Sequence, residues 1–587
     1  MARPQRNDGK IHLHLRKNGG SVYASSNEAY SRDDKRRFRI VDWGTISKGN
    51  VFVPGRRFLY ERGRWDDFVF PGGWDISAVE QLKDKYRPGR PASTKRDRSL
   101  LYGSVWFLTE VAKKLGLVSD LMAVLGGNTD KVNDILTLAL FPLVCPKSYS
   151  HLAQWQTIER MPSPEAITSR DVTLLTQGIS ESDRMELFRY RMKRIDRSHV
   201  LAVDSTSKST YGSSLADIRW GKNKERIPLA QTNEVVVYSL NGHMPVLYQE
   251  LPGNIPDLRT MELVQTLLEH AGCPDAARLT DRGYLTQPVL DFLLWKGVPF
   301  ICCVKASSGI VADLVASISR GEIKMEVKVG SGNYEVQQDV PYYYEDTLHG
   351  GAGKKAAKLK ADIYFDPVRK AMEQRDLDIA VKEQALLLED LRKEQAVVSA
   401  QQDLRDDCRL HDIVFDEAGH VASFAANEKR VESRRRVMGY IAMLTNKLDL
   451  DASQAWETYS LRDEQEKYFA DMKGAMLDDR NPAWSEKGKE GRLFVHFVGL
   501  TVYSHIKHVW KKLDLRDQFG TVDAVIDEMK NIRCIEHTGK AKIITPFVGK
   551  QLKVCEYFGL EVPDGCAPKV KGVNSKTGRK NKKATQD

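Results

Sequence analysis

The sequence lacks the features of exported, disulfide-bonded and membrane-spanning proteins. Its eight cysteines, in 587 residues, include no CxxC pair, so the spacing indicates neither a disulfide framework nor a zinc ribbon. The longest apolar run, near Ile135 to Cys145, is too short to cross a bilayer, and the residues after Met1 are basic and polar. We therefore expect a cytoplasmic protein with no membrane partner.

A phosphate-binding loop for nucleotides is also missing. The segment Gly350–Lys355 contains glycines and lysines, but it lacks both the leading glycine at the required distance and the Ser or Thr that follows the lysine in such loops. Cys534 and His537 have half of a zinc spacing without a second pair, which favours structural roles for both. We expect no nucleotide cofactor.

Positive charge is concentrated at the two ends of the chain. Residues 1–100 hold 22 Lys and Arg against 12 Asp and Glu, and the tail 569–587 holds seven basic residues and one acid. Since the whole chain carries +10, residues 101–568 carry −6. Basic ends suit a polyanion such as double-stranded DNA, although solvated, disordered tails have the same composition.

The order of elements in residues 196–305 is typical of one fold. Three strands are followed by a helix, a strand, a second helix and a strand, which is the order of an α/β ribonuclease-H-like core. The pattern then breaks into β-like pieces, a Lys/Gly loop at 350–360 and a charged helical stretch at about 367–409. We interpret this part as a β-rich plus helical insertion. Apolar residues along its helix fit either a dimerisation arm or a packing helix, and they are Leu377, Val381, Leu388 and Leu391.

The rest of the multidomain chain divides by composition and periodicity. Short β-like runs predict a strand-rich N-terminal arm, and apolar spacing of three and four residues predicts a helical DNA-binding bundle after it. The basic stretch Arg87–Arg98 between them could lie along a DNA groove or simply join two domains. The predicted domains are the arm and linker (1–98), the helical domain (99–195), the first part of the core (196–305), the insertion (306–454), the second part of the core (455–515), a C-terminal region (516–568) and a basic tail (569–587).

A predicted helix over Ala455–Met476 carries the most specific signal. Because a helix turns by about 100° per residue, positions separated by three, four and seven residues fall within roughly 60° of one another. Four polar residues have these separations and therefore form one stripe along the helix, beside an apolar face. They are Tyr459, Arg462, Glu466 and Lys473. A surface helix with an Arg–Glu pair at i,i+4 is the structural alternative.

This spacing, Y-x2-R-x3-E-x6-K, resembles the signature of bacterial insertion-sequence transposases of the DDE class. The family also ends its first core strand in an aspartate, as Asp204 does in Val-Asp-Ser-Thr, and has a turn matched by Asp281-Arg-Gly-Tyr. The resemblance covers roughly residues 200–512 and identifies Asp204, Asp281 and Glu466 as the catalytic residues. It implies cleavage of DNA at terminal inverted repeats and strand transfer into target DNA, by a homodimer that holds two element ends.

The resemblance also implies a metal site. Three carboxylates are the hard oxygen ligands that Mg²⁺ prefers, and two such ions, with Mn²⁺ able to substitute, would serve phosphoryl transfer. In the family the acid at the Asp204 position bridges both ions, and those at Asp281 and Glu466 complete one each. Four further residues are candidates for binding DNA or positioning phosphate, namely Tyr459, Arg462, Lys473 and Lys305.

Two other functions fit the same residues. A different two-metal DNA nuclease on this core would use the same carboxylates, and only the joining of cleaved ends to a target would separate it from a transposase. A DNA-binding derivative that has lost activity is the second alternative. The three acids at the expected positions argue against it.

Overall fold

The computed structural model of the chain describes two compact units, which are presented one at a time. The first contains residues up to 184, 474–478 and from 485 onward, and the second contains residues 185–473 and 479–484. Within them the described residues are 9–32, 35–84, 98–196, 198–209, 219, 231–255, 257–281, 283–328, 333–345, 353–474, 476, 485–537 and 541–566. The predicted linker, apart from Arg98, and the predicted tail lie outside these residues.

The N-terminal part of the first unit is a small sheet with an aromatic core. Strands β2 to β5 pair antiparallel in sequence order, and the short strands β1 and β6 pair in parallel. The elements are β1 (Ile11–His12), β2 (His14–Asn18), β3 (Ser21–Arg32), β4 (Lys35–Ser47), β5 (Val51–Pro54), α1 (Arg56–Tyr60), β6 (Phe68–Val69) and α2 (Ser77–Asp84). Trp43, Phe52, Phe58, Trp65 and Phe68 are buried in one cluster, so this region has its own hydrophobic core.

Helices make up most of the rest of the first unit. They are α3 (Gly103–Lys114), α4 (Leu117–Val124), α5 (Thr129–Val144), α6 (Leu152–Trp155), α7 (Ser169–Gln177), α17 (Glu486–Lys512), α18 (Arg516–Phe519), α19 (Val522–Met529) and α20 (Lys550–Phe558). The long helix α17 packs against α5 and α7. A β-carbon on Gly491 would lie 1.9 Å from the carbonyl oxygen of Thr176, and one on Gly499 would lie 2.5 Å from that of Ala139. Glycine at these two positions therefore allows the backbones to meet.

A three-stranded sheet joins two distant segments of the first unit. Its strands are β7 (Arg98–Leu101), β19 (Arg533–Glu536) and β20 (Ile543–Ile544), in the order β20-β19-β7. The Glu536 carboxylate forms ion pairs with Arg98 at 2.8 Å and with Arg160 at 2.7 Å. The C-terminal segment is thereby fastened to the start of the helical region.

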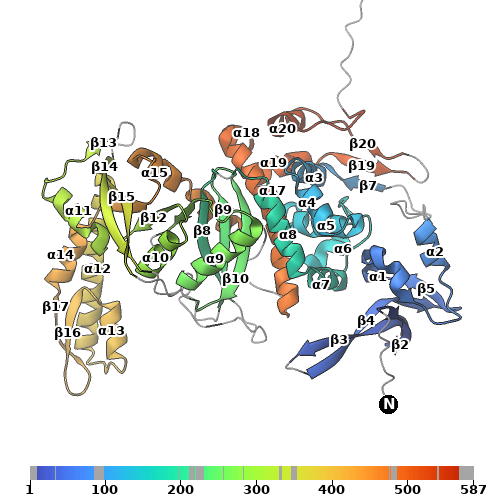
Figure 1. Ribbon diagram of the computed structural model, residues 1–587, viewed down its shortest axis with the longest axis horizontal. Helices are drawn as coiled ribbons and strands as arrows, with labels where there is room; N and C mark the ends of the chain where they lie inside the picture. The colour runs from blue at the N-terminus through green and yellow to red at the C-terminus, as the bar shows by residue number, and fades with distance from the viewer. Residues whose placement is uncertain are drawn as a thin grey trace, which may run out of the picture. The chain divides into compact units, whose positions relative to one another are not determined.

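The second unit is built on a nine-stranded mixed sheet (Figure 1) with the order β10-β9-β8-β11-β12-β18-β15-β14-β13. Its first strands in sequence, β8, β9 and β10, are antiparallel, and β11 and β12 run parallel to β8. The predicted succession of three strands, helix, strand, helix and strand is confirmed. These elements are β8 (Leu201–Ser209), β9 (Gln231–Ser239), β10 (Met244–Pro252), α9 (Asp257–Ala271), β11 (Arg278–Thr280), α10 (Gln287–Trp295) and β12 (Phe300–Val304).

The segment predicted as an insertion extends this same sheet by four strands. They are β13 (Glu326–Val327), β14 (Tyr334–Tyr344), β15 (Lys355–Phe365) and β18 (Tyr440–Thr445), and α11 (Gly309–Ser319) precedes them. The prediction of a loop through residue 360 is wrong from Lys355 onward, because β15 begins there and pairs with β14 and β18. Leu359, Ala361 and Ile363 are buried, and their alternation with Lys360 and Asp362 was a strand signal in the sequence that the prediction of a loop passed over.

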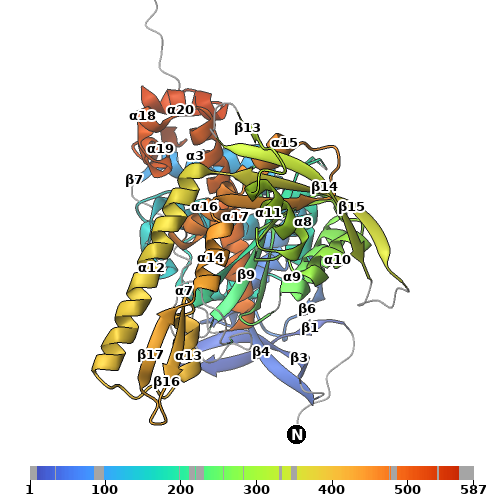
Figure 2. The same cartoon turned by 90° about the vertical axis from the view of Figure 1, so that its left-hand side faces the viewer.

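A helical subdomain branches from the outer part of this sheet. It consists of α12 (Pro367–Lys393), α13 (Gln401–Asp407), β16 (His411–Phe415), β17 (Val421–Ala426) and α14 (Glu428–Arg436). Figures 1 and 2 both show α12 alongside the β16–β17 hairpin. Leu377 and Leu388 are buried, and Val381 and Leu391 pack partly buried beside them. These contacts support a packing helix rather than a dimerisation arm for this apolar stripe.

No helix in the described ranges combines the length and the apolar composition needed to cross a membrane.

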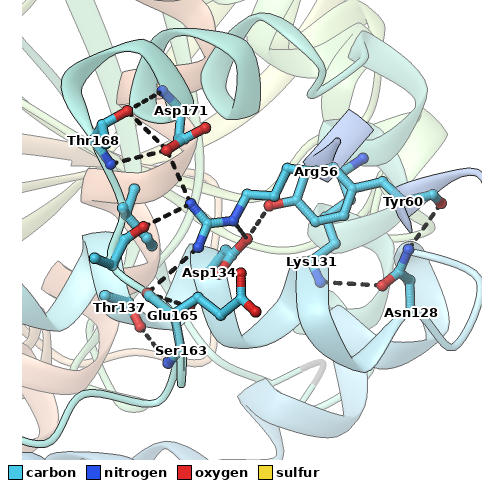
Figure 3. A network of polar contacts seen from close by, with 12 residues as sticks. Arg56, Tyr60, Asn128, Lys131, Asp134, Thr137, Ser163, Glu165, Thr168 and Asp171 are labelled. Carbon is cyan, nitrogen blue, oxygen red and sulfur yellow. Dashed lines mark hydrogen bonds and ion pairs between the residues drawn. The ribbon is translucent and has the colours of Figure 1, made fainter. Parts of the chain in front are cut away.

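A buried ion pair fastens the N-terminal sheet to the helices of the first unit (Figure 3). Arg56 of α1 contacts Asp134 of α5 at 3.3 Å and Asp171 of α7 at 3.1 Å. Tyr60 donates a hydrogen bond to the same Asp134 carboxylate, and Asn128 donates to the Tyr60 carbonyl at 2.8 Å. Burial raises the pKa of Asp134 to about 6, so this carboxylate depends on its partners for its charge.

Replacement of Arg56 by Met should destabilise the first unit in a pH-dependent way. At pH 8 the free energy of unfolding should fall by about 3 kcal/mol, because removing one partner leaves a buried charge uncompensated. The loss should shrink at pH 5, where protonation neutralises Asp134. The pKa of Asp134 is raised from 3.8, so protonation stabilises the folded state, and that contribution is lost as the pH rises through about 6.

The control is the double variant Arg56→Met/Asp134→Asn, in which both charges are removed. Urea titrations at the two pH values should show that it recovers most of the loss seen at pH 8. An equal loss at pH 5 and pH 8 in the single variant would contradict the role given to the ion pair.

Candidate active site

Two of the predicted acids lie side by side where a pair of parallel strands stops pairing. In the pairing of β8 with β11, Val203 lies opposite Thr280, and the predicted aspartates are the next residues in the chain, each after a run of buried residues. The prediction that the first strand ends at Asp204 is wrong, because β8 continues to Ser209 and remains paired with β9. Both side chains are half-buried, and the Asp204 carboxylate accepts a hydrogen bond from the backbone N–H of Ser205 at 2.7 Å.

The predicted helix over 455–476 is divided into two helices. Helix α15 (Ala452–Ser460) ends one residue after Tyr459, and α16 (Asp463–Gly474) begins one residue after Arg462. Between them the hydrogen bonds shorten to i,i−3 spacing, from the N–H of Arg462 to the carbonyl of Tyr459 at 2.9 Å and from Glu464 to Leu461 at 3.0 Å. The prediction of one continuous helix is wrong because the tighter turn breaks the regular α-helical ladder.

Gln465 connects α16 to the strand that bears the first aspartate. Its side chain is fully buried, and its amide donates to the carbonyl of Val236 at 2.8 Å and to that of Ala202 at 3.3 Å. Glu466 is the next residue, so this anchor fixes the start of α16 beside β8 and β9. The sequence reasoning missed Gln465, although its place within the apolar face of the predicted helix was a signal for a buried polar contact.

A single guanidinium connects the acids of the site. Arg462 lies 3.4 Å from the Asp281 carboxylate and 2.5 Å from that of Glu466. The Arg462 side chain is 17% exposed and the Glu466 side chain is 52% exposed, so the arginine lies on the inner side of the pair. The structure thus brings Arg462, Asp281 and Glu466 together. The spacing in the sequence predicted a shared stripe for Arg462 and Glu466, whereas Asp281 was a candidate through the family resemblance alone.

The third predicted acid, Asp204, also acts electrostatically on the Arg462 guanidinium. Burial alone would lower the pKa of the Arg462 guanidinium. The acidic groups around it raise that pKa above its ordinary value instead, and in order of effect they are Tyr459, Asp281, Glu466 and Asp204. Arg462 is therefore the counter-ion of Asp281 and Glu466, and Asp204 has a smaller effect on it.

The aromatic residue of the motif supports this arginine. The Arg462 guanidinium lies 5.4 Å from the centre of the Tyr459 ring, within the range of a cation–π contact. Tyr459 is half-buried in a cluster with Trp456, and burial raises the pKa of its phenol well above the usual value. It is therefore neutral at physiological pH and acts as a hydrogen-bonding group there.

The two remaining candidate residues lie at different places. Lys473 is half-buried near the end of α16, seven residues beyond Glu466, and Lys305 is exposed directly after β12. The roles of both lysines in binding DNA or positioning phosphate remain predictions.

The predicted ligands are carboxylates, which suit a divalent cation by their chemistry, but two of them are paired with Arg462. Within the described residues, no three side chains of His, Cys, Asp or Glu stand together as a group that could hold a metal ion. Instead, Arg462 supplies the positive charge to the carboxylates of Asp281 and Glu466. Carboxylate oxygens gathered around one cation are the ligands that Mg²⁺ or Mn²⁺ prefers.

Replacement of Gln465 by Met should remove the anchor of α16 with little change in volume. We expect the free energy of unfolding of the second unit to fall by about 1–2 kcal/mol, because the carbonyls of Ala202 and Val236 lose their buried amide donor. The same change at Gln402, which is exposed on α13, is the matched control. Equal thermal unfolding of the two variants would show that Gln465 does not hold the helix in place.

Comparison with known proteins identifies the family. A model described as a transposase DDE domain matches residues 196–500, more than half of the 587-residue chain, and this confirms the resemblance inferred from the motif. A chain in the cryo-EM structure of a piggyBac transposase synaptic complex with hairpin DNA is 9% identical, with a TM-score of 0.31 over 77% of this chain and 74% of that one. That likeness is too distant to carry an argument. No curated protein sequence matches the chain. The chain belongs to the family of transposases with a DDE domain.

Proposed function

We propose that this transposase cleaves DNA at the terminal inverted repeats of a mobile element and transfers the new 3′ ends into target DNA. The observation that carries the proposal is the ion pairing of Asp281 and Glu466 with one guanidinium, together with the position of Asp204 beside Asp281 where β8 and β11 pair. These contacts link three acids that are far apart in the sequence. Such an arrangement serves phosphoryl transfer, in which charge must be balanced around a scissile phosphate.

The strand order supports a ribonuclease-H-like core for this chemistry. The first five strands have the spatial order β10-β9-β8-β11-β12, so the first strand in sequence is central and bears the first acid. The second acid follows the adjacent parallel strand. Ligands of open α/β sheets generally bind near the carboxyl ends of parallel strands, and both aspartates directly follow the last residues that pair between β8 and β11.

The three acids would hold two Mg²⁺ ions, with Mn²⁺ as a substitute. When bound, such ions activate the attacking oxygen and stabilise the leaving oxygen. The family resemblance gives Asp204 the bridging position and Asp281 and Glu466 one ion each. The remaining groups orient the substrate: Arg462 and Lys473 contact the DNA backbone, and Tyr459 positions a terminal phosphate or base.

Arg462 has two consecutive partners in this proposal. Before metal and DNA bind, it neutralises Asp281 and Glu466. With DNA bound, the guanidinium would contact a phosphate of the backbone, for which its planar set of donors is well suited, while Asp281 and Glu466 would be the residues that hold the cations. The N-terminal arm, the helical domain and Lys305 would supply further DNA contacts, and a homodimer would hold two element ends.

Isosteric removal of each carboxylate should abolish cleavage while DNA binding persists. The variants are Asp204→Asn, Asp281→Asn and Glu466→Gln, each incubated with Mg²⁺ and a plasmid that carries the ends of the parent element. We expect the rate to fall by at least about 10³-fold, because the lost charge stabilises the reacting phosphate (~4 kcal/mol).

The matched control is Glu457→Gln, an acid on α15 whose side chain is 74% exposed. It should retain cleavage and joining. Retained cutting by any one of the three variants would remove that residue from the site, and cutting by the wild type without joining to target DNA would indicate a nuclease rather than a strand transferase.

Replacement of Arg462 by Gln should separate metal binding from DNA cleavage. Without DNA, the affinity for Mn²⁺ should rise roughly fivefold, because carboxylates released from a part-buried ion pair worth about 1 kcal/mol become free to bind the cation. Cleavage should fall, because the phosphate contact is lost. Calorimetric titration of the full chain measures the first effect, and weaker Mn²⁺ binding by the variant would contradict the counter-ion role.

A further inference from the structure

A second concentration of positive charge lies in the helical subdomain of the second unit. A cavity of about 750 Å³ opens between α13, β16 and α14, and it is separate from the residues of the candidate active site. Two carboxylates, Asp406 and Asp412, line it together with five basic side chains. The basic residues are Arg405, Arg409, Lys429, Arg430 and Arg434, and we call this cavity the basic pocket.

The hydrophobic contacts of the subdomain explain why these side chains face the cavity. Leu410 and Val431 are buried in one cluster against α12, and Cys408 and Ile413 are buried in a second. The apolar residues of α13 and α14 face α12. The charged faces of these two helices are therefore exposed. All five basic residues of the pocket are exposed.

Most of this charge is not neutralised by the protein. Asp406 lies 3.5 Å from Arg409, while Asp412 accepts a hydrogen bond from Asn427 at 2.7 Å. In the described part of the chain, no carboxylate lies within ion-pair distance of the other four basic residues, which are Arg405, Lys429, Arg430 and Arg434. The pocket therefore has an excess of cations that only an external anion can balance.

Two of the three pocket cations on α14 lie where a cation does not stabilise the helix, whereas Arg434 lies in the last turn, where the helix dipole favours it. Lys429 and Arg430 lie in the first turn of the helix, where the positive end of the helix dipole disfavours cations. Arg430 and Arg434 are also four residues apart, a spacing at which like charges destabilise a helix. An arrangement that costs local stability is expected where the charges bind a ligand.

We propose that the basic pocket is a second DNA-binding site, which holds the phosphate backbone of a duplex segment apart from the cleavage site. This inference rests on the proposed function, because it assumes that the chain acts on DNA. A duplex suits the pocket better than a single small anion, since several dispersed, exposed cations match a row of phosphates and gain from counter-ion release. No base contact is implied, so the site binds without sequence preference.

The test measures duplex binding by the full-length chain as a function of salt. The double variant Lys429→Gln/Arg434→Gln removes two exposed cations that have no carboxylate partner. In fluorescence anisotropy with a labelled duplex, its affinity should fall at low salt, and the slope of log K against log salt should decrease in magnitude by about 2. Lys382→Gln, the same change at an exposed position on α12, should leave both quantities unchanged.

Three outcomes would overturn the inference. Wild-type affinity and slope in the double variant would show that the pocket does not bind duplex DNA. An equal effect of Lys382→Gln would show that only net charge matters. If the double variant loses calorimetric binding of inorganic pyrophosphate but keeps duplex binding, the ligand is a free phosphate compound.

These outcomes are distinct from a failure of the proposed function. In each case cleavage by the wild type would leave the proposed function standing, whereas a wild type that neither binds nor cuts DNA would refute that function itself.

Discussion

The parallel pairing of β8 with β11 is the constraint on which the candidate active site depends. It makes Asp204 and Asp281 neighbours although 77 positions separate them, because both follow paired residues on adjacent strands. A shift of the pairing by one residue would turn one carboxylate to the opposite face of the sheet. The buried residues that precede both aspartates oppose such a shift, since they would lose their places in the core.

The third acid reaches the site by a different route. Glu466 lies on a helix rather than a strand, so its place depends on how α16 meets the sheet. The buried amide of Gln465 sets that contact by donating to carbonyls of two adjacent strands, and the Arg462 ion pairs orient the carboxylate next to it. The Glu466 side chain is more exposed than that of Asp281, so it has more freedom to move. Such freedom suits a carboxylate that must change its position when metal and DNA bind.

Arg462 gives the site a stable charge balance in the absence of substrate. The carboxylates of Asp281 and Glu466 would repel one another, and a guanidinium between them that is only 17% exposed offsets that repulsion. The cation–π contact with Tyr459 holds the guanidinium in place. In the helical subdomain the balance is reversed, with uncompensated cations instead of acids. In the second unit, the candidate active site thus has the charge to bind cations, and the basic pocket has the charge to bind anions.

The sequence predicted the core better than its surroundings. Strong apolar runs ending in single acids identified β8, β11 and the two aspartates, and helical spacing identified Arg462 and Glu466. The break between α15 and α16 was not predictable, because it depends on how Tyr459 and Gln465 pack against the sheet. Strand β15 was missed because its first residues, rich in lysine, continue the composition of the Lys/Gly segment before it, although Leu359, Ala361 and Ile363 alternate with polar residues. The basic pocket was missed because its five cations come from separate short elements.

The central claim is that Asp204, Asp281 and Glu466 together hold the divalent cations used for DNA cleavage. Its most direct test is the structure of the full chain bound to element-end DNA and Mn²⁺, with the metal located by anomalous scattering. The account predicts Mn²⁺ within about 2–2.3 Å of oxygens from all three carboxylates, with the Arg462 guanidinium on a DNA phosphate. Metal bound elsewhere, or Glu466 still paired with Arg462 and remote from both aspartates when DNA is bound, would contradict it.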